Sequence, residues 1–270
     1  MVRCVTDQFP TGEVLDLQDL PRYWAVVDAA YRRARRAPMP PPYELTARRF
    51  DESQPAGHRA YIATERYLTV AMDNQRALVK LLEHHGATHS APWSLLRPAF
   101  ECGFFAAWVL DPTDGAVRRR RGLQVEVRDE IEQQNHIKAF ASVPDATDLV
   151  AEAIAQRKAR SEASYRRDAQ ALNVKWDTVR QKVNVVDELR KIRFLQPHEP
   201  GVRATFIATW RMLSGFEHGL GWAMLRGSNA KRRAEIPGGH VMELSMKDDA
   251  FVTAGKCTAW LMLEAAQRLE

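Results

Sequence analysis

Three side chains able to do chemistry lie in one short segment, WRMLSGFEHG, which runs from Trp210 to Gly219. They are Arg211, Ser214 and His218, and steps of three or four residues place them on one face of a helix. A histidine titrates near neutral pH and can move a proton, whereas an arginine can bind a phosphate and stabilise developing charge. His218 could deprotonate a ribose 2′-hydroxyl while Arg211 stabilises the transition state, which amounts to metal-independent RNA cleavage. We therefore take all three as candidate catalytic residues.

The helix expected to carry these residues, 203–226, is apolar over most of its circumference, which indicates burial. A buried arginine needs a partner, because an isolated buried charge is very costly. Arg97 and Glu101, four residues apart in the apolar segment LLRPAFECGFF, could supply one, and Arg97 could itself pair with Glu101 or Glu217. We expect a supporting cluster between two helices that comprises Arg97, Glu101, Arg211, Ser214 and His218. The alternative is that this cluster is structural and only fixes how the helices pack.

Three glycines interrupt the same segment. Gly215, Gly219 and Gly221 each lower helix stability by roughly 1 kcal/mol relative to alanine. Such glycines are expected where another backbone or a ligand comes close.

The spacing from Arg211 to His218 is Arg-x6-His, near the end of a chain that reads as helical. This spacing resembles the Arg-x4-6-His signature of HEPN-type helical proteins. Many members of that family are ribonucleases, often toxins or defence effectors, and they often form the site across a dimer. The resemblance implies RNA rather than DNA as the partner, and a homodimer. It covers Arg211 and His218 only, and Met212 stands where the family usually has a polar residue.

A second resemblance covers residues 92–226. The order RPAFE, a tryptophan, LDP, an arginine-rich helix and LSGFEHG is similar to bacterial all-helical proteins of unknown function with an RPxxE…LSGxxHG pattern. It implies the helical fold and the polar cluster, and no activity.

Helical periodicity dominates the chain. The expected helices are 13–37, 57–85 with Gly86 at its end, one that ends before Pro112, 116–140, one from about Asp145 to 171, 203–226 and 249–269, while GGHVMELSM could form a short strand. The fold class is therefore all-α, a multi-helix bundle in which a HEPN-like arrangement is one option. We expect an N-terminal helix and a proline-rich arm around Pro40–Pro42 in residues 1–56, and a helical bundle domain in 57–270.

Residues 169–182, AQALNVKWDTVRQK, also fit a helix-turn-helix. The pattern predicts two helices joined by a tight turn at Asn173. Thr178, Arg180 and Gln181 would lie on a recognition helix that faces the DNA major groove. A DNA-binding regulator is therefore an alternative function, and an ordinary helix–loop–helix is the plain alternative for the segment.

The densest run of charge could bind phosphate backbones of a nucleic acid. It consists of Arg118, Arg119, Arg120 and Arg121. The run lies near an expected helix N-terminus, where the helix dipole disfavours cations. A solvated helix face is the alternative.

The composition bounds the class of protein. The 270 residues carry a net charge of +5, which permits a polyanionic partner. We expect no metal or cofactor, because Gly86 separates His84 and His85 from His89 and no HExxH, Walker, GxSxG or GxGxxG motif occurs. No apolar run reaches the ~18 residues that a membrane helix needs, and the N-terminus lacks a secretory signal, so we expect a cytoplasmic protein without a membrane partner. A non-enzymatic helical interaction protein is the remaining alternative.

Overall fold

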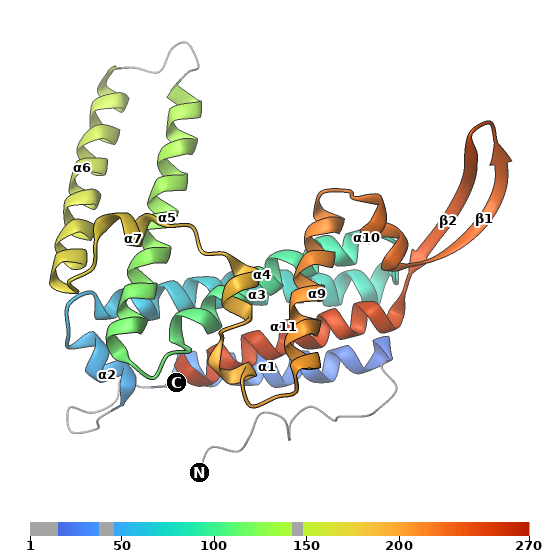
Figure 1. Ribbon diagram of the computed structural model, residues 1–270, viewed down its shortest axis with the longest axis horizontal. Coiled ribbons are helices and arrows are strands. Elements are labelled where there is room, and N and C mark those ends of the chain that lie inside the picture. The colour runs from blue at the N-terminus through green and yellow to red at the C-terminus, as the bar shows by residue number, and fades with distance from the viewer. Residues whose placement is uncertain (1–15, 38–45, 142–147, 270) are drawn as a thin grey trace. The chain divides into compact units, whose positions relative to one another are not determined.

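The computed structural model describes residues 16–37, 46–141 and 148–269. These residues form eleven α-helices, two short 3₁₀ helices and one two-stranded antiparallel sheet (Figure 1). The predicted all-α, multi-helix fold is confirmed. The proline-rich arm predicted around Pro40–Pro42 lies outside the described residues.

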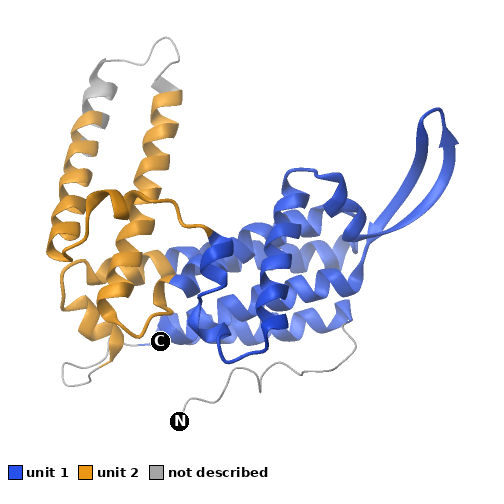
Figure 2. Ribbon diagram, in the orientation of Figure 1, with its two compact units in different colours: residues 1–37, 65–108, 185–270 blue, residues 38–64, 109–184 orange. Residues whose placement is uncertain are grey.

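The chain divides into two compact units (Figure 2). Unit 1 comprises residues 1–37, 65–108 and 185–270, and unit 2 comprises 38–64 and 109–184. This division differs from the expected boundary after residue 56, since the N-terminal helix packs on the C-terminal helix and belongs to unit 1.

Unit 1 is a helical bundle with a projecting β-hairpin. Its elements are η2 (Leu17–Asp19), α1 (Leu20–Arg36), most of α3 (Gly57–His85), nearly all of α4 (Ala91–Leu110), α8 (Val185–Leu189), η3 (Arg193–Leu195), α9 (Pro200–Glu217), α10 (Gly221–Arg226), β1 (Ser228–Ile236), β2 (Gly239–Met246) and α11 (Asp248–Leu269). The apolar sequences of α4 and α11 explain their central place, because residues such as Trp93, Phe100 and Phe251 are fully buried. Burial of such side chains is the main force that holds the bundle together.

Unit 2 is built on a long antiparallel pair of helices. Its elements are α2 (Ala47–Glu52), the first turns of α3, α5 (Gly115–Ala141), α6 (Asp148–Ala171) and α7 (Trp176–Arg180). A cluster of Leu123, Val127, Ala169 and Val179 joins α5, α6 and α7. Gly122 lets α5 approach α3 closely, since a Cβ atom at this position would lie 2.5 Å from the Cα atom of Ala60.

The prediction of one continuous helix over residues 203–226 is wrong. α9 ends at Glu217, and α10 begins only at Gly221. Gly219 adopts a left-handed conformation with φ +63°, and the N–H of Leu220 donates to the Gly215 carbonyl at 2.8 Å. This hydrogen bond closes α9 as in a helix C-cap, so residues 203–226 do not form one continuous helix.

The sequence predicted one of the two strands of the sheet. The GGHVMELSM strand is present as β2, and its partner β1 was missed. β1 has the sequence SNAKRRAEI, which lacks the apolar alternation by which a strand is predicted. Both strands are exposed over most of their length, so neither face needs to be apolar. The pairing also contains an irregularity between Arg232 and Ala234.

Candidate functional site

Arg97 lies at the centre of a polar cluster between α4 and α9 in unit 1. Its guanidinium is 3.3 Å from Glu101 Oε2 and 3.1 Å from Glu217 Oε2, and it lies 3.5 Å from the centroid of a Trp210 ring. The Arg97 side chain is 8% exposed. The prediction that Arg97 pairs with Glu101 or Glu217 is confirmed for both carboxylates. The cluster joins α4 to α9, which is a structural role.

The other members of the predicted cluster do not join it. Arg211 and His218 are exposed and Ser214 is half-buried, and neither Arg211 nor His218 forms an ion pair within the described part of the chain. The expectation that Arg211 faces Arg97 or Glu101 is therefore wrong. The reason is geometric: Arg211 follows Trp210, so its side chain points about 100° further round the helix. His218 follows the last residue of α9 as its C-cap.

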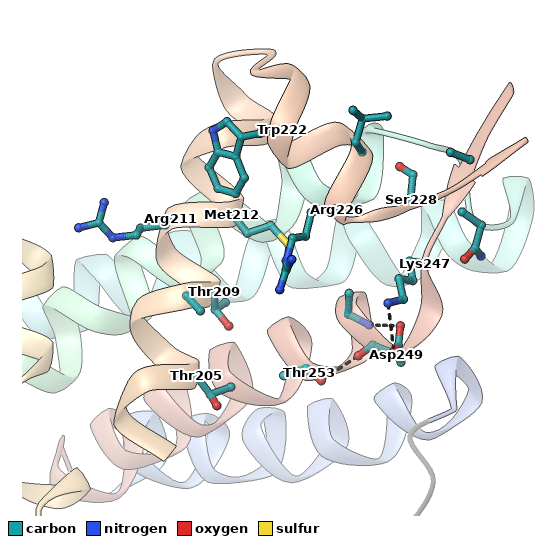
Figure 3. Close-up of a pocket in the computed structure, with 15 residues that line it drawn as sticks. Thr205, Thr209, Arg211, Met212, Trp222, Arg226, Ser228, Lys247, Asp249 and Thr253 are labelled. Atoms are coloured by element: carbon teal, nitrogen blue, oxygen red, sulfur yellow. Dashed lines mark hydrogen bonds and ion pairs between the residues drawn. The ribbon is translucent and has the colours of Figure 1, made fainter. Parts of the chain in front are cut away.

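Arg211 instead borders a groove in unit 1. The groove lies between α9, α10, the base of the β1–β2 hairpin and the start of α11, and its volume is about 870 Å³ (Figure 3). Figure 3 shows Arg226 reaching into the groove from α10, while Arg211 lies at its rim with the guanidinium turned outward. Met212 lines the groove between them, and His218 is not among its lining residues.

Two packing contacts of glycines position the walls of this groove. A Cβ atom on Gly215 would lie 2.5 Å from the Cβ atom of Ala223, so the glycine lets α10 pack directly on α9. A Cβ atom on Gly227 would lie 2.5 Å from the Phe216 ring, which fixes the chain just before Ser228. The expectation of a close backbone or ligand at the three glycines is therefore not borne out: the neighbours of Gly215 are side chains, and nothing in the described chain lies within 4 Å of a Cβ atom added at Gly219 or Gly221.

The groove carries unmatched positive charge beside apolar surface. Arg211 and Arg226 have no ion-pair or hydrogen-bond partner in the described ranges, whereas Lys247 lies 3.6 Å from Asp249. Trp222, on the short helix α10, is 51% exposed. Ser228 is buried, and its hydroxyl oxygen has no hydrogen-bond partner. The groove therefore offers complementary side chains to a phosphate, to a planar ring and to a hydrogen-bonding group.

Most arginines of the run at 118–121 interact with other groups of the protein. Arg118 is buried, and its Nε donates to Asp51 Oδ2 at 2.6 Å. Its Nη1 donates to the carbonyl oxygens of Pro112 and Thr113, each at 2.8 Å. Burial alone would lower the pKa of Arg118, but the hydrogen bond and charge of Asp51 outweigh it and raise the pKa. Arg118 is therefore corrected from a phosphate ligand to a structural residue.

The remaining arginines of the run differ from one another. Arg119 is half-buried and donates to the carbonyl oxygens of Gly115 and Pro55. Arg121 is also half-buried, and Arg120 alone within the run is classed as exposed. The run therefore does not form a continuous strip of exposed arginines that could bind phosphates.

The predicted helix-turn-helix segment folds as two helices with a tight turn. α6 ends at Ala171, Asn173 adopts φ +53°, and the N–H of Val174 donates to the Ala169 carbonyl at 2.9 Å. This geometric prediction is confirmed, and Thr178, Arg180 and Gln181 are exposed. However, α7 has only five residues, about 7.5 Å of helix. It is shorter than the recognition helices that lie in a major groove.

Neither a metal site nor a membrane span is found in the part of the chain that the structure describes. Within residues 16–37, 46–141 and 148–269, no group of three or more His, Cys, Asp or Glu residues is placed to hold a metal ion. No helix in the described part of the chain is long and apolar enough to cross a membrane. Comparisons with protein-family models, curated proteins and solved structures found no match.

Proposed function

We propose that unit 1 binds RNA in the groove beside α9 and α10. The observation that carries this proposal is the pair Arg211 and Arg226, which lack partners among the described residues and flank the exposed Trp222. Phosphate contacts by arginine supply most of the affinity for nucleic acid, and unstacked bases pack on aromatic rings. RNA presents such bases in its loops and single-stranded segments.

Metal-independent cleavage is a catalytic extension of this proposal, and it would take place beside the groove, because His218 does not line it. In this form Arg211 holds the scissile phosphate, and His218 accepts the proton of the 2′-hydroxyl. Ser214 lies between them in the sequence, on α9, and its hydroxyl can donate a hydrogen bond to a phosphate oxygen. The product would carry a 2′,3′-cyclic phosphate, and EDTA would not inhibit the reaction.

The two alternatives rest on weaker observations. A DNA-binding regulator would have to read a major groove with the five residues of α7. A purely structural interaction protein is consistent with the Arg97 cluster, but that cluster leaves Arg211 and Arg226 unexplained.

A binding experiment tests the proposal. Fluorescence anisotropy with a labelled single-stranded RNA should show at least tenfold weaker binding when Arg211 and Arg226 are both changed to Ala, since each removes a charge-assisted contact. Arg22→Ala is the matched control, because Arg22 is an 80% exposed arginine of unit 1 outside the groove. Equal binding by the groove variant and the control would overturn the proposal.

A cleavage experiment tests the catalytic form separately. The protein is incubated with the same RNA in EDTA, and the product ends are identified by mass. His218→Ala should slow cleavage by about 10²–10⁴-fold while RNA binding persists. Binding without cleavage by the wild type would leave the groove as an RNA-binding site and remove His218 from any catalytic role.

A further inference from the structure

Unit 2 contains a second, smaller cavity. It lies between α5, α6 and α7 and has a volume of about 210 Å³. The residues that give it chemical character are Lys138, Lys158, Arg180, Tyr165 and Trp176. Its floor is the apolar contact of α5 with the rest of unit 2, at Val127 and Ile131. A cavity with an apolar floor and convergent polar groups is the usual form of a small-molecule site.

Three cations converge on this cavity from three different helices. Lys138 comes from α5, Lys158 from α6 and Arg180 from α7, and none of them has a partner among the residues that the structure describes. Convergence from separate elements differs from an ordinary solvated helix face, where the charges lie on one helix.

The acidic residues of the cavity do not neutralise these cations. Glu130 accepts a hydrogen bond from Gln134 at 2.8 Å, and Glu162 accepts one from Arg166 at 2.8 Å. Glu162 forms an ion pair with Arg166 at 2.7 Å, whereas Glu130 keeps its negative charge because Gln134 is neutral. Three cations against one carboxylate without an ion pair in the described chain leave a net positive charge on the cavity lining.

Two aromatic rings complete the lining. Arg59 lies 4.5 Å over the Tyr165 ring, and Arg166 lies 4.5 Å over a Trp176 ring, but neither arginine lines this cavity. Arg166 lines a separate depression that Trp176 also borders, so ring surface of Trp176 remains available on the cavity side. The Tyr165 hydroxyl can donate a hydrogen bond, because a tyrosine is protonated at neutral pH, and burial, with Glu126 as the next cause, raises its pKa further.

We propose that this cavity binds a small phosphorylated molecule with a planar ring, of the chemical class of a nucleoside monophosphate. The phosphate contacts Lys138, Lys158 and Arg180, and the ring packs against Trp176 and Tyr165. The cavity is large enough for the ring, because one of about 150 Å³ accommodates benzene. The sugar and the phosphate would extend beyond it, among the exposed side chains of Lys138, Lys158 and Arg180. The proposal concerns residues of unit 2 alone and does not depend on RNA binding in unit 1.

Calorimetric titration tests this site with three probes: adenosine 5′-monophosphate, adenosine and inorganic phosphate. We expect the monophosphate to bind more tightly than either part alone, because it engages both the cations and the rings. Lys158→Ala and Arg180→Ala, made separately, should each weaken its binding by about tenfold, the worth of one hydrogen bond to a charged group. Arg167→Ala is the matched control, since Arg167 is an exposed arginine of α6 that does not line the cavity.

The two substitutions lie on different helices, so a folding defect in one leaves the other as a test. Absence of binding at millimolar adenosine 5′-monophosphate would overturn the proposal. So would equal binding by both variants and the control, or binding of inorganic phosphate as tight as that of the nucleotide. A labelled RNA with a 5′-phosphate that competes with the nucleotide for the same two residues would support the site and identify an RNA end as the source of the ligand.

Discussion

Arg118 in unit 2 and Arg211 in unit 1 are both helical arginines that the sequence analysis predicts to contact a phosphate of a nucleic acid, and the structure gives them opposite surroundings. Arg118 is buried and donates to Asp51 and to two backbone carbonyls. Arg211 is exposed and borders an open groove. The difference lies in what each guanidinium meets: a carboxylate and carbonyls satisfy one, and solvent surrounds the other. An arginine whose hydrogen bonds are all met inside the protein stabilises the fold, and one without partners is available to a ligand.

Removing the buried partner should have the largest effect. Arg118→Met would leave Asp51 buried beside Tyr61 without its counter-ion, and we expect a loss of about 3–5 kcal/mol in the free energy of unfolding. Arg120→Ala, in the same run but exposed, should change it by no more than about 0.5 kcal/mol. Urea denaturation followed by circular dichroism measures both. Similar losses in the two variants would contradict the distinction between buried and exposed arginines.

The close packing around Arg118 can be tested at Gly122, one helical turn further along α5. Gly122→Ala would bring a Cβ atom to 2.5 Å from backbone atoms of Ala60, which cannot move without shifting α3. We expect a loss of about 1–3 kcal/mol in the free energy of unfolding, the usual cost of overpacking. Gly201→Ala is the control, because nothing lies within 4 Å of its added Cβ atom and alanine favours the helix. If Gly122→Ala is neutral, α5 and α3 approach less closely than described.

The role of the exposed arginines is tested by the salt dependence of RNA binding. If Arg211 and Arg226 each neutralise one phosphate, the double change to alanine should reduce the slope of log affinity against log salt by roughly 0.7 for each phosphate that is no longer neutralised. The free energy of unfolding should stay within about 0.5 kcal/mol of wild type, because neither side chain has a partner to lose in the described structure. Anisotropy titrations over a series of salt concentrations measure the slope. An unchanged slope would mean that these arginines do not contact RNA.

The sequence predicted what depends on local spacing. The period of apolar residues gave the helix from Gly57 to His85, with Gly86 in the left-handed region at its end. The spacing of four residues between Arg97 and Glu101 gave their ion pair.

What the sequence did not predict depends on contacts between distant segments. Asp51 and Arg118 are separated by 67 residues, so no spacing links them. The direction of Arg211 depends on which face of α9 packs on α4, and the apolar residues on both faces left that choice open. The groove itself exists because α9 ends at Glu217 and α10 turns back, and an apolar pattern that continues through Gly219 conceals that break.

The ion pairs of Asp28 in α1 are intermediate between the buried pair of Arg118 and the exposed Arg211, which is unpaired among the described residues, because the partners of Asp28 are exposed. It forms ion pairs with Arg76, at 2.8 Å, and with Arg32, while its own side chain is 18% exposed. Burial alone would raise the pKa of Asp28, but the hydrogen bonds from Arg76 and Arg32 outweigh it and lower the pKa. The stabilisation is therefore present above the unfolded pKa of about 3.9 and is lost as pH falls through the lower value of the folded state.

Substitution of Asp28 should therefore have a small effect on the free energy of unfolding, and one that depends on pH. Asp28→Asn should lower the free energy of unfolding at neutral pH by about 0.2–1 kcal/mol, the range for exposed ion pairs. The gap between variant and wild type should narrow below about pH 4, where the wild-type carboxyl also becomes protonated. Asp73→Asn on α3 is the control, because Asp73 is exposed and has no partner in the described chain. Urea denaturation from neutral to acid pH gives both curves. A gap that stays constant across this range would show that the arginines do not stabilise the Asp28 carboxylate, so that partners exposed to this degree contribute nothing measurable to the fold.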